Sequence, residues 1–167
     1  RITGSYITID ATDAPSPGIT LTAAHAGVAA ALLDLRGASH IIVRNIRVID
    51  APDTDTGDNL RIWEYAHHIV IDHCSFRRAG DGNVDIVRDA HDITIQWCIL
   101  ADTVKNSLIA ERCYNISLHH NLYALGDERN PQVDDTTFVD FVNNVVYGWV
   151  GNYGSRIRNG ASANVVM

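Results

Sequence analysis

The stretch Asn115-Ile-Ser-Leu-His-His-Asn121, continued by Leu-Tyr-Ala-Leu-Gly-Asp-Glu-Arg-Asn-Pro131, decides the fold of this chain because pieces of it recur on both sides. Its first half alternates apolar and polar residues, as a strand with one buried face does. Its second half predicts a turn through Gly126 that brings Arg129 to the surface before a stiff Asn-Pro step. The stretch is therefore both one unit of a repeat and a candidate site.

The repeat consists of one short apolar strand that leads to a second. The copies are Leu33–Arg36 with His40–Ile46, Leu60–Trp63 with His68–Cys74, Val84–Val87 with Asp92–Cys98, Leu108–Glu111 with Asn115–Asn121, and a partial copy at Phe138–Asn144. When these copies are aligned, one column holds Ile46, Cys74, Cys98, Asn121 and Asn144, at intervals of 28, 24, 23 and 23 residues. A period in the twenties indicates a repeat architecture.

Short strands at this period, rich in Val, Ile and Thr and without helical periodicity, predict an all-β solenoid, the parallel β-helix. In such coils the aligned residues face one another about 4.8 Å apart. We expect Asn121 and Asn144 to bond amide to amide, as in cross-β ladders. Antiparallel hairpins are the alternative, but hairpins would not keep one column in register at such constant spacing.

The ends of the chain are less regular. Residues 5–10 and 19–22 are expected to be strands, residues 23–31 receive no assignment, and residues 157–167 look like a strand. We expect residues 1–167 to form a single domain. Solenoids need polar end caps, and none is recognised here, so we expect the chain to be a segment of a longer protein that lacks one or both caps.

Composition limits the possible partners. The chain has 20 acidic and 13 basic residues, a net charge of −7, which argues against nucleic acid or an anionic membrane as partner. No apolar run reaches the ~20 residues that a membrane-spanning helix needs. The three cysteines, Cys74, Cys98 and Cys113, have no Cys-x-x-Cys spacing, so we expect buried free thiols rather than disulfides or a zinc site.

Acidic residues gather at the starts of two successive repeat strands. Asp81 and Asp85 flank Gly82, and Asp58 lies at the matching position of the preceding coil. Three carboxylates on one edge of the solenoid repel one another unless a cation neutralises them. Oxygen ligands of this kind suit Ca²⁺. The alternative is that each Asp-Gly pair marks a turn whose carboxylate is solvated.

Basic residues follow in the next two coils. Lys105 lies at the matching start of the next strand, and Arg129 comes one coil later. A face with acids in two coils and bases in the next two can hold an anionic substrate.

The histidines, by contrast, are not expected to form a metal site. Neighbours on a strand point to opposite faces, so neither the pair His119 and His120 nor the pair His67 and His68 is expected to chelate one ion. We expect structural roles for the eight histidines.

These residues resemble the pectate lyase family. The similar pieces are Ile71-Asp72-His73, Asp81-Gly82-Asn83-Val84-Asp85-Ile86, Thr94-Ile95-Gln96-Trp97-Cys98, Lys105-Asn106-Ser107-Leu108-Ile109, and Leu118–Tyr123 followed by Arg129-Asn130-Pro131. The resemblance implies a right-handed parallel β-helix, a secreted and monomeric protein, a calcium cofactor, and cleavage of polygalacturonate or a related acidic polysaccharide by β-elimination.

The resemblance also implies roles for single residues. Asp58, Asp81 and Asp85 match acidic calcium ligands, Lys105 matches a lysine that contacts the substrate carboxylate, and Arg129 matches the arginine assigned as the base. Together they would form the catalytic and metal sites of a calcium-dependent pectate lyase.

Two positions depart from the family pattern. Thr56 stands where the family often has an acid, although Asp55 is adjacent, and Asp134 stands where a second arginine is common. The loss of that cation and the gain of Asp134 and Asp135 are expected to weaken the binding of a polyanion. A catalytically impaired relative, and a non-catalytic β-helix that binds polysaccharide as adhesins or tailspikes do, are therefore the alternatives. Hydrolysis by paired carboxylates is disfavoured, because Lys105 and Arg129 have no role in it.

Overall fold

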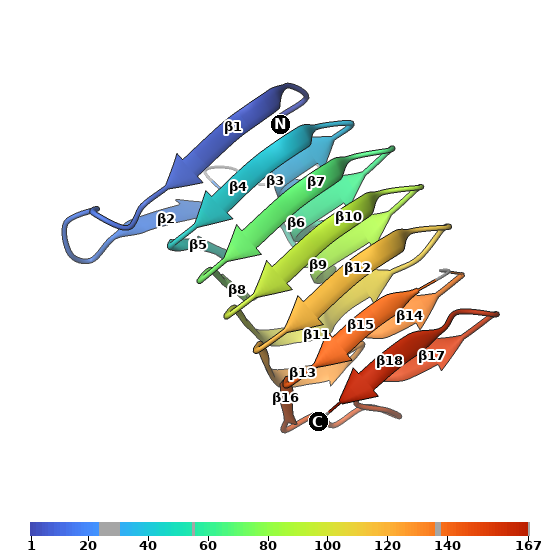
Figure 1. Cartoon of the computed structure of the whole chain (residues 1–167). Coiled ribbons are helices and arrows are strands. Elements are labelled where there is room, and N and C mark those ends of the chain that lie inside the picture. The colour runs from blue at the N-terminus through green and yellow to red at the C-terminus, as the bar shows by residue number, and fades with distance from the viewer. Residues whose placement is uncertain (24–30, 55, 136–137, 167) are drawn as a thin grey trace.

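The computed structural model describes residues 1–23, 31–54, 56–135 and 138–166. The chain winds into stacked coils, and all strand pairings in this part of it are parallel (Figure 1). The expected parallel β-helix is thereby confirmed, and the alternative of antiparallel hairpins is excluded. Among the described residues, no helix is long and apolar enough to cross a membrane.

One wall of the solenoid is a sheet of seven strands, to which each coil contributes one strand. In spatial order it contains β1 (Ser5–Asp10), β4 (Ser39–Arg44), β7 (His67–Asp72), β10 (His91–Gln96), β12 (Tyr114–His119), β15 (Val139–Val142) and β18 (Ala163–Val166). Figure 1 shows these strands as the front row of arrows, side by side from β1 to β18.

The opposite wall is a larger sheet in two halves that the long strand β11 (Ile99–Ile109) joins. The first half holds β2 (Ile19–Thr22), β5 (Ile46–Ile49), β8 (Ser75–Arg77), β13 (Leu122–Glu128) and β16 (Val145–Tyr147). The second half holds β3 (Ala31–Arg36), β6 (Asp58–Trp63), β9 (Gly82–Val87), β14 (Gln132–Asp134) and β17 (Arg156–Arg158). The expected strands at residues 5–10 and 19–22 are confirmed, whereas residues 157–167 contain two short strands rather than one.

The core lies between the walls and is built of stacked aliphatic side chains. Ile41, Ile69, Ile93 and Ile116 pair in register from coil to coil, and each is at most 1% exposed. Burying such a side chain contributes roughly 1.5–3 kcal/mol. The apolar alternation seen in the sequence therefore specifies which side of each strand faces inward.

A corner separates the seven-stranded wall from β5, β8, β11 and β13. His73, Trp97 and His120, which precede the column found in the sequence, have positive φ angles of 50°, 52° and 56°. This left-handed conformation turns the chain sharply. The bend aims Cys74, Cys98 and Asn121 inward, where they are 1–2% exposed.

Hydrogen bonds in this column differ in one respect from the expectation. The backbone N–H of Asn121 donates to Oδ1 of Asn144 (2.9 Å), and the Asn144 amide donates to the carbonyl of Leu118 (2.7 Å). The predicted column is present. The prediction that the side-chain amides of these two residues bond to each other was wrong. Cys74, Cys98 and Cys113 are free and buried, as predicted.

The prediction that neighbouring histidines point apart was also wrong. Nδ1 of His67 lies 2.7 Å from Nδ1 of His68, and the corresponding distance for His119 and His120 is 2.9 Å. His68 and His120 have positive φ angles of 53° and 56°. This conformation breaks the alternation of an extended strand and brings consecutive rings together.

Candidate active site

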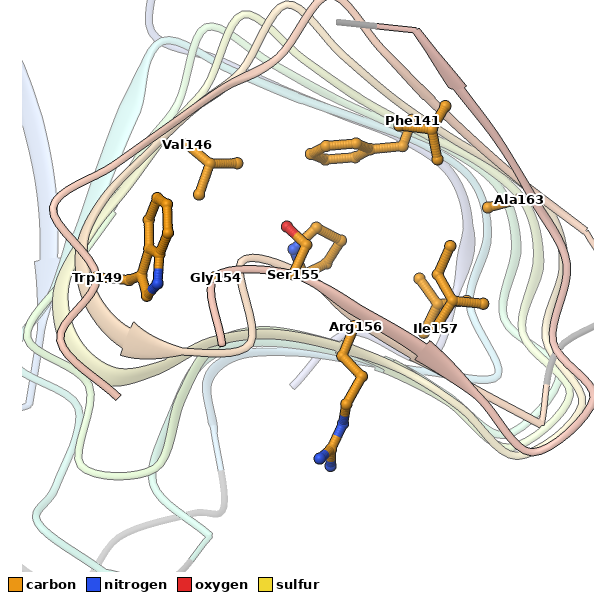
Figure 2. Close-up of a pocket in the computed structure, with 11 residues that line it drawn as sticks. Phe141, Val146, Trp149, Gly154, Ser155, Arg156, Ile157 and Ala163 are labelled. Atoms are coloured by element: carbon orange, nitrogen blue, oxygen red, sulfur yellow. The ribbon is translucent and has the colours of Figure 1, made fainter. Parts of the chain in front are cut away.

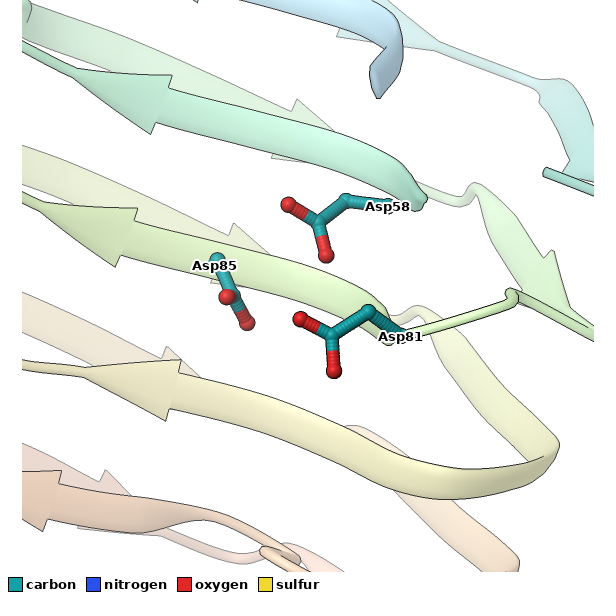
Figure 3. Close-up of side chains that lie close together, drawn as sticks. All are labelled: Asp58, Asp81 and Asp85. Carbon is teal, nitrogen blue, oxygen red and sulfur yellow. The ribbon is translucent and has the colours of Figure 1, made fainter. Parts of the chain in front are cut away.

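Three carboxylates meet on the outer face of the larger sheet. Asp58 begins β6, Asp81 precedes β9, and Asp85 lies within β9. Figure 3 shows their side chains converging from two adjacent coils, and one oxygen of each lies within 4.8 Å of the others. The structure therefore brings together the three acids that the sequence singled out. Asp55 lies outside the described residues.

The cluster is electrostatically strained. Asp58 is 0% and Asp85 7% exposed. Burial raises the pKa of both carboxyl groups, and the charge of Asp85 raises that of Asp58 further. The positive charge of Arg61 lowers the pKa of Asp58, because Nη2 of Arg61 lies 2.5 Å from Oδ2 of Asp58. Additional positive charge at the cluster would stabilise the ionised carboxylates.

Gly82 leaves room between the carboxylates. Its N–H donates to Oδ1 of Asp58 (3.0 Å). A Cβ at this position would lie 2.7 Å from Oδ1 of Asp85 and 3.0 Å from Oδ1 of Asp58, so a larger residue would crowd the cluster. The oxygen donors and the space that Gly82 leaves beside them fit a hard cation such as Ca²⁺.

Lys105 lies one coil further along, within β11 rather than at the start of a strand. Its Cα pairs with Gly82, and its Nζ lies 2.5 Å from Oδ1 of Asp81. The ammonium group therefore stands at the edge of the acidic cluster, where it can meet an anion held beside a bound cation.

Arg129 is an extra residue in its coil. In the preceding coil Lys105 and Asn106 are consecutive. Lys105 pairs with Glu128 and the Asn106 side chain bonds to Asn130 (2.6 Å), so the residue between Glu128 and Asn130, Arg129, has no counterpart in that coil. Its φ is +59°. Such bulges re-aim side chains at functional sites. Its charge lowers the pKa of Asp85, and its Nε is buried without a hydrogen bond among the described residues.

The turn expected at Gly126 is absent, because β13 runs straight through it. A Cβ on Gly126 would lie 2.2 Å from Nδ2 of Asn106 and 2.7 Å from Oδ1 of Asn130. The glycine is needed for close packing in a strand and not for a bend.

A second asparagine ladder supports this face, and the sequence analysis missed it. Asn59, Asn83, Asn106 and Asn130 are at most 1% exposed and bond amide to amide, at 2.7, 2.7 and 2.6 Å. Each directly follows Asp58, Gly82, Lys105 or Arg129. The signal was present as asparagines at intervals of 24, 23 and 24 residues. The ladder fixes the spacing of the site residues from coil to coil.

The sequence analysis also missed Arg156, which begins β17 one coil beyond Arg129. Its Nη2 donates to Oε1 of Gln132 (3.2 Å), its guanidinium lies 4.2 Å from the centre of the Tyr153 ring, and its Nε is buried without a hydrogen bond among the described residues. In the described part of the chain it has no carboxylate partner. Arg156 therefore extends the positive charge of the site.

Asp134, which stands where a second arginine is common in the family, is paired in the structure. Asp134 is 6% exposed, and Nη2 of Arg158 lies 2.6 Å from its Oδ2. Asn159 donates a further bond to Oδ1 (2.6 Å). The charge of Asp134 is therefore neutralised from the next coil.

An apolar cavity of about 610 Å³ lies near β16, β17 and β18, away from the acidic cluster. Figure 2 shows Phe141, Val146 and Trp149 around it, whereas the Arg156 side chain points away from it. The cavity holds none of the predicted site residues, so we assign the chemistry to the outer face.

Comparison with known proteins finds relatives named as pectate lyases. No family model matches the chain. A pectate trisaccharide-lyase of Thermotoga sp. strain RQ2 is 32% identical over 149 residues, which cover 80% of this chain and 39% of the relative. A probable pectate lyase C of Emericella nidulans is 34% identical over 121 residues, which cover 70% of this chain and 28% of the relative.

The chain is thus a homologue of pectate lyases, and these relatives support the family expected from the sequence. It spans less than two fifths of the length of either relative.

Proposed function

We propose that this chain carries the catalytic face of a calcium-dependent pectate lyase, a secreted and monomeric enzyme that cleaves polygalacturonate or a related acidic polysaccharide by β-elimination. One observation carries the proposal: in a homologue of pectate lyases, the three-aspartate cluster lies beside Lys105, with Arg129 on the coil that follows.

Asp58, Asp81 and Asp85 would hold the Ca²⁺. When bound, the ion would withdraw charge from the uronate carboxylate and so acidify the adjacent C5–H. Lys105 binds the same carboxylate and adds to this stabilisation, as preorganised donors do where negative charge develops.

Arg129 takes the C5 proton, the C5 electron pair forms the C4=C5 double bond, and the C4 oxygen leaves with the departing sugar. Guanidinium groups ordinarily keep their proton, so this step requires an unusual environment. The Nε of Arg129 is buried, and no acceptor among the described residues binds its N–H.

The test is the ultraviolet absorbance of the unsaturated product, followed with polygalacturonate and Ca²⁺. We expect a rise with the wild-type chain, loss of the rise in Arg129→Ala, and calcium binding that persists in that variant. Arg47→Ala is a control that removes an arginine of β5 whose side chain bonds to Thr20 and to the carbonyl of Pro17. An unchanged rate in Arg129→Ala would show that the base is wrong. Substrate binding without a rise in the wild type would favour a non-catalytic polysaccharide-binding β-helix or an impaired relative.

A further inference from the structure

Arg61 lies against the acidic cluster of Asp58, Asp81 and Asp85, and the proposed lyase chemistry gives it no part. It alternates with buried neighbours on β6 and so faces outward, and in register it lies between Asp34 of β3 and Asp85 of β9. Its Nη2 lies 2.5 Å from Oδ2 of Asp58, and its side chain is only 15% exposed. A nearly buried ion pair therefore stands where the proposed calcium ligands meet.

Asp34 does not compete for Arg61, although it lies beside it in the sheet. Nε of Arg1 donates to one carboxylate oxygen of Asp34 (2.6 Å), and Nε1 of Trp63 donates to the other (2.7 Å). The Trp63 ring in turn lies 5.8 Å from the Arg61 guanidinium. Both oxygens of Asp34 are engaged elsewhere, so the charge of Arg61 acts on the acidic cluster.

The Asp58 carboxylate is held on both sides before any ion arrives. Gly82 donates its N–H to Oδ1 (3.0 Å), and Arg61 lies at Oδ2. Oδ2 is buried and accepts no hydrogen bond among the described residues, so its contact with Arg61 is one of charge. A cation can therefore share this oxygen without breaking a hydrogen bond.

Two cations balance most of the charge of the cluster. Arg61 is paired with Asp58, and Lys105 is paired with Asp81. Three ionised carboxylates and these two cations leave one net negative charge, which a divalent ion turns into one net positive charge. A single uronate carboxylate neutralises that charge. Without Arg61 the loaded site would be less positive by one unit and would attract an anion less.

We propose that Arg61 regulates the calcium site electrostatically, opposing the ion in the free protein and favouring it in the complex with an acidic sugar. Repulsion by the guanidinium weakens calcium binding when no sugar is present. The positive charge of the loaded site attracts the uronate carboxylate, so ion and sugar each tighten the binding of the other. This inference rests on the proposed function and adds a regulation to it: the site fills when substrate arrives.

The experiment measures calcium affinity by calorimetry on metal-free protein, without sugar and with saturating D-galacturonate, which has no glycosidic bond to be cleaved. A calcium electrode measures the free ion, because galacturonate itself binds some of it. In the wild type, galacturonate should tighten calcium binding at least ~5-fold. Arg61→Gln should bind calcium at least ~10-fold more tightly than the wild type without sugar. Its gain from galacturonate should fall below about twofold.

Two variants serve as controls. Arg61→Lys keeps the charge and should keep both affinities within about threefold of the wild type. Arg36→Gln removes another arginine that lies over Trp63 (4.8 Å) but pairs with Glu64 (2.6 Å), and it should leave both affinities within about twofold. Metal-free Arg61→Gln should also melt at a lower temperature than the wild type and gain more on adding calcium, because the ion takes over the balancing of buried carboxylates.

Three results would overturn the inference: unchanged or weaker calcium binding by Arg61→Gln, an equal effect in Arg36→Gln, or a wild-type affinity that galacturonate does not change. The last result needs no variant, so it decides even if Arg61→Gln folds poorly. A wild type that binds no calcium with or without sugar would instead remove the calcium site from the proposed function, and the inference with it. All these readouts are independent of turnover.

Discussion

Nζ of Lys105 lies 2.5 Å from Oδ1 of Asp81, so the candidate substrate lysine is paired with a candidate calcium ligand. Both side chains are partly buried, with 33% and 14% of their surfaces exposed. A cation bound by Asp81 would compete with Lys105 for that oxygen. Under the proposed function, metal binding and presentation of the lysine to substrate would therefore be coupled.

Lys105→Ala should separate these two roles. Removing a positive charge beside the cluster should raise calcium affinity several-fold, because Coulomb repulsion of the ion is lost. Turnover should fall by roughly 10²-fold, as expected for the loss of one preorganised donor. Calcium titration and the absorbance assay measure the two effects, and Lys105→Arg is the control that keeps the charge. Unchanged calcium affinity would contradict the coupling.

Calcium affinity should rise with pH. Burial raises the pKa of Asp58 and Asp85, so protons compete with the ion until the pH exceeds these raised values, and affinity then levels off. Calorimetric titration at several pH values checks the direction.

Asp85→Ala should raise the calcium requirement and reduce the gain in melting temperature on adding calcium. A gain as large as that of the wild type would remove Asp85 from the ligand set.

Gly126→Ala should destabilise the fold by about 2–4 kcal/mol, because its Cβ would overlap the Asn106 and Asn130 amides and break two buried hydrogen bonds. Gly4→Ala is a matched control, since its Cβ would lie 3.6 Å from Cδ1 of Ile7, an ordinary contact. Denaturant unfolding compares the two variants. Equal free energies of unfolding for the two variants would contradict the prediction, because they would mean that the Asn106 and Asn130 amides move aside for the added Cβ at little cost.

Arg156→Ala and Arg158→Ala should behave differently. Arg156 has no carboxylate partner among the described residues, so its loss should raise KM for polygalacturonate several-fold with little change in stability. Arg158 neutralises the nearly buried Asp134, so its loss should lower the melting temperature, because an unpaired buried charge is costly. Enzyme kinetics and thermal unfolding of both variants test this contrast. A lower melting temperature in Arg156→Ala together with a higher KM in Arg158→Ala would contradict it.

The rate at which the three cysteine thiols react with a reagent tests whether the core is closed to solvent. Cys74, Cys98 and Cys113 are at most 2% exposed, and burial raises the pKa of Cys113 to about 12. The hydrogen bond with Cys98 lowers the pKa of Cys74, so slow reaction of that thiol depends on its burial. At pH 8 the native protein should react slowly with a thiol reagent, because the three buried sulfur atoms are out of its reach, and all three thiols should react after denaturation. Rapid reaction of a thiol in the native protein would show that the coils open locally.

Much of the site was predictable from the repeat. The positions of Asp58, Asp81, Asp85 and Lys105 follow from coil register, because residues one period apart stack in a parallel solenoid. The contacts of neighbouring histidines were not predictable in this way. Their prediction assumed regular strand alternation, and single left-handed residues such as His68 and His120 break it.

By itself, the sequence determined the solenoid, its parallel strands and the inward face of each coil, because alternation and period are properties of residue order. Only the tertiary structure decided which side chains are neutralised and which are left unpaired. Asp134 is neutralised by Arg158 from the next coil, and the bulge at Arg129 leaves its Nε buried without a hydrogen bond among the described residues. Such pairings depend on distances of a few ångströms between coils, and a one-residue insertion changes them without altering the repeat.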